Sequence, residues 1–202
     1  MSKVAIVGDP SGTGTFTISA PNGNTDRTLV LPDEAGTVLT SASGLTAGNL
    51  TGSVPASAMP AGSVIQVVTG SNSGATITTT SGGLVSSGVS FTFTPKLANS
   101  KILVAFYFTG TSTNGSAQGG TKYTIYRDST NLYGGFANLG HIIYSTLATD
   151  YIHAPLYVTA ADTLATTATV NYTLYFSLVG SGTASIQRDW AGVHYFAQEI
   201  AA

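Results

Sequence analysis

The sequence predicts an all-β protein, with an antiparallel β-sandwich or jelly-roll-like domain at the C-terminal end of the chain and an arm of short strands before it. Three observations predict this fold class. Charged residues make up only 8% of the chain, against roughly 25% in a typical soluble domain. Thr, Val, Tyr and Phe, which favour strands, are frequent, and the 24 Gly favour the turns between them. Short segments of strand-like sequence also recur at the spacing of a sandwich.

Residues 1–40 predict short strands joined by turns. Gly14–Ser19 alternates polar and apolar residues, and Thr28–Leu31 begins a second strand that Pro32 ends. So few apolar residues cannot offset the cost of ordering the backbone, about 1–2 kcal/mol per residue. The segment therefore needs a partner surface, which either copies of itself around an axis or a second protein could supply. The residues expected to make its contacts are Phe16, Ile18, Leu29, Leu31 and Val38.

Residues 41–62 form a tract of Gly, Ser, Ala and Pro with isolated apolar residues. The spacing of these apolar residues matches neither a strand nor a helical stripe, and Pro55 and Pro60 oppose a continuous helix. We interpret the tract as an extended connector. Two alternatives remain open, a flexible linker and an ordered thin stalk in which the apolar residues meet their symmetry mates.

Residues 63–202 predict the domain with a substantial core, a sandwich head. Val170–Leu178 places five apolar side chains on one face, which predicts a strand over a core. Ile102–Phe108 is apolar on both faces, so it is either central in the sandwich or also buried against a neighbouring subunit. We expect Leu103 and Tyr107 at such an interface. The strand candidates are Val64–Val68, Phe91–Thr94, Ile102–Thr109, Tyr123–Tyr126, Tyr151–Val158, Val170–Val179 and Val193–Ile200.

Composition restricts the partners and the compartment. The net charge of −2 and the pI near 5.8 offer no basic stripe for phosphates, so we expect no nucleic acid partner. The absence of Cys excludes disulfides and thiolate zinc sites and is compatible with a reducing cytosol. The apolar run Val4–Val7 is shorter than a signal-peptide core, and Ile102–Phe108 is shorter than the ~20 residues of a membrane helix. We expect neither a signal peptide nor membrane insertion.

Motifs for chemistry are weak. Val4–Gly8, followed by further glycines, superficially suggests a phosphate-binding loop, but a predicted strand follows where the chemistry needs a helix N-terminus. His141, His153 and His194 are too scattered for a metal-ligand motif, and a hydrogen-bonded structural role is the default for each. A metal on a symmetry axis stays open. We expect no enzyme, no cofactor and no catalytic or metal site.

Aromatic residues beside polar turns could form a receptor or glycan surface, because such rings offer a flat apolar face and a polar tip. Packing in the core or at a subunit interface is the alternative for each of them. Arg127 next to Asp128 suggests a local solvated ion pair. The aromatic candidates are Tyr126, Tyr133, Tyr144, Tyr151 and Trp190.

Several segments in order resemble the C-terminal domain of bacteriophage fibre and appendage proteins and the short-strand segment upstream of it. They are Thr15–Pro21, Arg27–Val38, Phe91–Val104, Tyr123–Asp128, Thr169–Leu174 and Glu199–Ala202. The resemblance implies a homotrimer that projects from the virion surface, made in the host cytoplasm, with other capsid or tail proteins as partners. Residues 1–40 would then be its virion-attachment and trimerisation arm. Because the chain has no extended shaft, we favour a capsid decoration, cement or head-fibre protein. The alternatives are a short tail fibre that binds the host receptor and a carbohydrate-binding adhesin module.

Overall fold

A computed structural model of the chain describes residues 7–8, 10–15, 17–19, 22–28, 30, 54–113, 119–133, 143–145, 151–189 and 192–202. The chain divides into two compact units, Met1–Leu50 and Thr51–Ala202. The described residues of the first unit contain no strand, and these include Gly14, Thr15 and Thr17–Ser19 of the predicted strand. Ile18 and Val30 are 74% and 80% exposed, so neither side chain buries enough apolar area to offset the ordering of the backbone.

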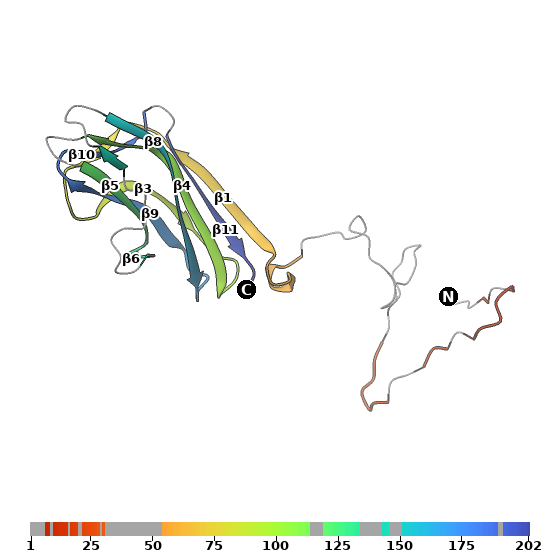
Figure 1. Ribbon diagram of the computed structural model, residues 1–202. Helices are drawn as coiled ribbons and strands as arrows, with labels where there is room; N and C mark the ends of the chain where they lie inside the picture. The colour runs from red at the N-terminus through yellow and green to blue at the C-terminus, as the bar shows by residue number, and fades with distance from the viewer. Residues whose placement is uncertain are drawn as a thin grey trace. The chain divides into compact units, whose positions relative to one another are not determined.

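The second unit, which we call the head, is built from antiparallel strands, and its described residues contain no α-helix. A single 3₁₀ turn, Ala56–Ala58, precedes the first strand. Figure 1 shows the strands arranged as two layers. The strands are β1 (Val64–Asn72), β2 (Ile77–Thr79), β3 (Val85–Phe93), β4 (Ser100–Thr113), β5 (Gly119–Arg127), β6 (Thr130–Asn131), β7 (Ile143–Ser145), β8 (Tyr151–Leu164), β9 (Val170–Gly180), β10 (Thr183–Gln187) and β11 (Val193–Ile200).

The first sheet is centred on the long strand β4. One edge of β4 pairs with β8 from Ser100 to Thr113, and the other edge pairs first with β11 and then with β10. Strand β1 pairs with β11, and β2 pairs with β10. Strands β1 and β2 therefore form one discontinuous strand, and β10 and β11 form a second one beside it. The interruptions of these two discontinuous strands are adjacent in the sheet.

The second sheet has the order β3–β9–β5, and both β6 and β7 pair with the free edge of β5. The connections β2–β3, β3–β4, β4–β5, β8–β9 and β9–β10 each pass from one sheet to the other. Each sheet thus contains strands that are distant in sequence, and the hydrophobic core lies between the two layers.

Side chains of β9 and β4 supply much of this core. Val170, Tyr172, Leu174, Phe176 and Leu178 are all buried, which confirms the prediction from their alternation. The even-numbered residues of β4 from Ile102 to Phe108 are also buried in the core. On the opposite side of β4, Leu103 is 40% and Tyr107 50% exposed. The strand is therefore central in the sandwich, as one of the two interpretations predicted, and it also presents apolar side chains outward.

The residues just before β1 and those just after β11 meet at one place. The amide of Gly62 donates to the carbonyl of Ala201 at 2.8 Å, and the amide of Ala201 donates to the carbonyl of Ser63 at 2.9 Å. The start of β1 and the end of β11 are therefore adjacent, as Figure 1 shows by the C label beside them.

Candidate functional site

The most distinctive surface of the head is the outer face of the first sheet. Three outward positions on each of β1, β11, β4 and β8 form a continuous grid, which we call the apolar face. No Asp, Glu, Lys or Arg stands at any of these positions. From strand to strand, they are Val67, Thr69 and Ser71; Gln198, Phe196 and His194; Leu103, Ala105 and Tyr107; and Ala161, Thr159 and Tyr157.

Large apolar side chains on this face are open to solvent. Val67 is 56%, Leu103 40%, Tyr107 50% and Tyr157 49% exposed. Leu103 and Tyr107 are the residues that the sequence predicted at a subunit interface, and the structure places both in the apolar face. The sequence did not indicate Val67, Tyr157 or Phe196, because only the pairing of β1, β11 and β8 around β4 brings them beside Leu103 and Tyr107.

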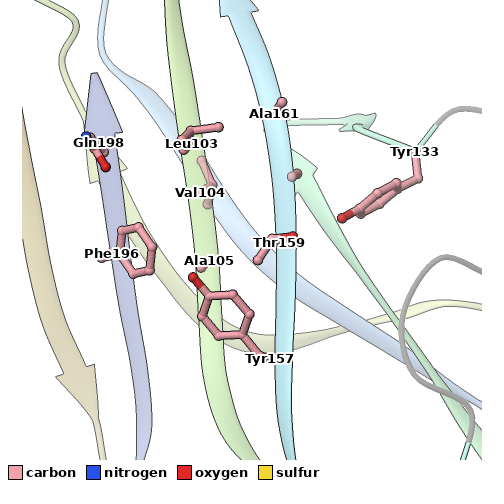
Figure 2. A pocket seen from close by; sticks show the side chains of 10 residues that line it. Leu103, Val104, Ala105, Tyr133, Tyr157, Thr159, Ala161, Phe196 and Gln198 are labelled. Carbon is pink, nitrogen blue, oxygen red and sulfur yellow. The ribbon is translucent and has the colours of Figure 1, made fainter. Parts of the chain in front are cut away.

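A hollow of about 480 Å³ opens on the apolar face across β11, β4 and β8. Figure 2 shows Leu103, Tyr157, Thr159 and Ala161 around it, with Tyr133 at one side. The ring centroids of Tyr157 and Phe196 are 6.3 Å apart. Burial raises the pKa of the Tyr133 hydroxyl, and its hydrogen bond with Thr159 offsets part of the rise. Tyr133 therefore stays neutral in ordinary buffers, and the hollow is uncharged throughout.

A row of side-chain hydrogen bonds crosses the same sheet next to the apolar face. The Thr76 hydroxyl donates to Gln187 Oε1 at 2.7 Å, and Gln187 Nε2 donates to Thr111 Oγ1 at 3.0 Å. Thr111 Oγ1 lies 3.0 Å from His153 Nδ1. The His153 ring thus has the structural role that the sequence assigned by default.

Arg188 joins the interruptions of the two neighbouring strands. Its Nη1 donates to Asn72 Oδ1 at 2.7 Å and its Nε to the carbonyl of Ala75 at 2.9 Å. Gly74 leaves the space that the guanidinium occupies, because a Cβ there would lie 2.6 Å from Arg188 Nη2. These contacts hold the interruption in a defined conformation, so it is a specific feature of the sheet rather than an irregularity.

A buried ion pair joins the two sheets. Arg127 Nη1 of β5 lies 2.6 Å from Asp162 Oδ1 of β8, with 25% and 7% of the side chains exposed. The Tyr172 hydroxyl donates to Asp162 Oδ2 at 2.9 Å, and burial together with the Asp162 charge raises the Tyr172 pKa. The predicted pairing of Arg127 with Asp128 is wrong. Asp128 accepts a hydrogen bond from the amide of Asn171 instead, at a turn position with φ 51°.

The second buried charge, Glu199, holds the loop between β3 and β4. Its carboxylate accepts hydrogen bonds from the amides of Lys96 and Leu97 at 2.9–3.0 Å and from Gln66 Nε2 at 2.6 Å. Burial on its own raises the pKa of Glu199, but these bonds, with one from Ser100, outweigh it and lower the pKa below its ordinary value. The sequence carries a signal for this role, because Glu199 shares the inward face of β11 with the buried Val193 and Ala197.

Replacing Glu199 with Gln is expected to destabilise the head by about 2 kcal/mol at pH 7, because an amide group cannot satisfy all the donors that converge on it. Since folding lowers the pKa of Glu199, its contribution is complete above the ordinary Glu pKa of about 4.3 and is lost as the pH falls through the folded value. The two proteins should therefore approach each other in stability below that pH. Urea unfolding at several pH values measures this. The exposed Asp26→Asn is the control, and a pH-independent gap would contradict the prediction.

Of the aromatic residues predicted for a glycan surface, the two whose side chains the structure describes lie on different sheets. Tyr126 stacks on Tyr175 at 4.0 Å on the outer face of the second sheet, whereas Tyr133 lies at the hollow of the first. Tyr144 and Tyr151 are described only as backbone, in β7 and β8. Within the described ranges, no three metal-ligating side chains of the His, Cys, Asp and Glu types cluster, and no helix is long and apolar enough to span a membrane. The predicted residues Phe16, Leu29, Leu31, Val38, His141 and Trp190 lie outside the described residues.

A scan against protein-family models and a search of curated proteins found no match to this chain.

Proposed function

We propose that this chain is a bacteriophage virion structural protein, a homotrimeric surface projection that its N-terminal arm anchors to the particle. A capsid decoration, cement or head-fibre role is the form we favour. The observation that carries the proposal is the apolar face, which exposes Leu103, Tyr107 and Tyr157 without a charge between them. Depletion of charge with enrichment of aromatic residues characterises the core of subunit interfaces.

The strand order supports a jelly roll. Counting β1 with β2, β6 with β7 and β10 with β11 gives two four-stranded sheets in the described part of the head, with connections that alternate between them. Eight-stranded double-sheet jelly rolls of this kind are used in viral capsids and in lectins. A structural protein of a capsid is therefore compatible with this architecture.

The buried charges of the head also support a structural role. Asp162 pairs with Arg127 across the two sheets, and Glu199 holds the β3–β4 loop by its backbone amides. Both carboxylates are thus occupied in holding segments together that are distant in sequence. Their contacts stabilise a rigid head, as expected of a projection that has to survive outside the cell.

The full-length protein is expected to have three times the chain mass of 20.5 kDa in light scattering. Because few ion pairs are available to the chain, the trimer should survive molar salt, where the Debye length falls to about 3 Å. Particles of the phage that encodes the protein, purified on a density gradient, should contain it at a fixed ratio to the capsid protein. A monomer at micromolar concentrations would overturn the trimer, and particles without the chain would overturn the virion role.

The alternative is a short tail fibre or adhesin that binds a glycan. The Tyr126–Tyr175 pair favours it, because two stacked, partly exposed rings lie there near the partly exposed Asn131. Binding of the full-length protein on a glycan array, lost in Tyr126→Ala, would support this alternative over a capsid role.

A further inference from the structure

We propose that the apolar face is buried against further copies of the same chain, with the β1 side of one copy packed into the hollow of the next. This inference rests on the proposed homotrimer and adds which surfaces meet. The protruding group is Val67, and the receiving group is the hollow between Leu103, Ala161 and Tyr133.

Charge identifies a second copy as the occupant. A partner of ordinary composition, with roughly 25% charged residues, would place charges against a face that has none to pair with them. Burying an unpaired charge is costly. The present chain has only seven basic and nine acidic residues in 202, and its own apolar face carries none of them. A second copy of this face can therefore pack against it without burying an unpaired charge.

The geometry of the face identifies the contact. Val67 pairs with Gln198, Gln198 with Leu103, and Leu103 with Ala161, so that these residues form one row across the four strands. Val67 ends the row on the β1 side, and the hollow covers the rest of the row, from Gln198 of β11 to Ala161 of β8. In a ring whose axis runs along the strands, residues of one row stay at the same height in every copy. Val67 of one copy then meets the hollow of the next.

This contact joins two unlike surfaces. Heterologous contacts of this type close into rings when the rotation between copies permits it. A ring of three uses every hollow and every Val67 once. The same pair of surfaces could also meet about a two-fold axis, but the assembly would then end at two copies.

Cysteine cross-linking of the full-length protein tests the contact, since the chain contains no Cys of its own. Val67 and Ala161 are both exposed, so V67C and A161C leave the core intact. With a short bis-maleimide, the double variant V67C/A161C is expected to give covalent dimers and trimers on a denaturing gel. Each single variant should remain a single chain. A mixture of the two single variants should give covalent dimers. The double variant T92C/K122C, on the outer face of the second sheet, is the matched control and should not cross-link between copies.

The outcomes separate this inference from the proposed trimer. A trimer in light scattering without 67–161 cross-links would overturn the contact and leave the trimer standing. Covalent dimers as the final product of the double variant, or cross-linking of V67C alone, would overturn the ring. A monomeric mass would overturn both. As a second measurement, Ala161→Arg should convert the trimer to a monomer with an unchanged circular dichroism spectrum, and a trimer that persists in this variant would contradict the contact.

Discussion

A protein that lacks residues 1–62 is expected to remain folded and to lose its binding to virus particles. The strands of the head begin at Val64, and the core cluster contains only residues from Val89 to Ala197. Deletion removes the hydrogen bonds from the amide of Gly62 to the carbonyl of Ala201 and from the amide of Ser63 to the carbonyl of Pro60, together with the two of the 3₁₀ turn, and leaves the pairing of the strands intact. Deletion also removes the apolar residues of the arm, which we expect to contact the particle. Each of them contributes about 1.5–3 kcal/mol to binding when it is fully buried.

The measurement is a binding assay on particles that lack the protein, with folding of the truncated chain checked by circular dichroism. Ile18→Asp in the full-length protein is the finer variant, because Ile18 is 74% exposed and has no role in the head. It should weaken binding and leave the spectrum unchanged. If the truncated head occupies particles as fully as the whole chain does, the head itself makes the contact and the arm is not the anchor.

Replacing Arg127 with Met is expected to lower the free energy of unfolding by about 3 kcal/mol. Removing one partner of a buried ion pair leaves the other charge uncompensated, which costs about 3–5 kcal/mol. The lower end applies here because a quarter of the Arg127 side chain is exposed. Asp162 would keep its bonds from Tyr172 and from the amide of Thr163, and these bonds limit the loss further.

Denaturant unfolding at equal protein concentration measures the effect. Lys122→Met, on the outward side of the same strand, is the matched control and should stay within about 0.5 kcal/mol of the parent. The double variant R127M/D162N should be less destabilised than R127M, because it removes both charges. If R127M were as stable as K122M, the pair would contribute nothing to the head.

The sequence predicted the elements that alternation defines. Val170–Leu178 has one wholly apolar face, and the structure buries that face. Leu103 and Tyr107 were predicted at an interface because the opposite face of their strand already supplied the apolar side chains that a core needs. Both inferences depend on a local period of two residues, which a single sequence displays.

The remainder of the site depends on pairing between distant strands. Tyr157 lies beside Tyr107 only because β8 follows β4 along its whole length, and no local pattern contains that register. Arg127 was assigned to its neighbour Asp128, whereas the fold brings Asp162 from the opposite sheet. Strands β2 and β10 escaped prediction because they are short and polar, and they are strands only because they continue β1 and β11.

The meeting of Gly62 and Ser63 with Ala201 has a practical consequence for the use of this head as a display scaffold. A peptide fused after Ala202 would emerge beside the connector, at the base of the head. The turn between β9 and β10 lies at the other end, because Thr183 pairs with Thr113 whereas Ile200 pairs with Lys101. The length of β4 separates these two ends by roughly 40 Å at about 3.3 Å per residue. Cargo inserted between Gly180 and Thr183 would therefore be presented away from the base, and cargo on the C-terminus would compete for space with the tether.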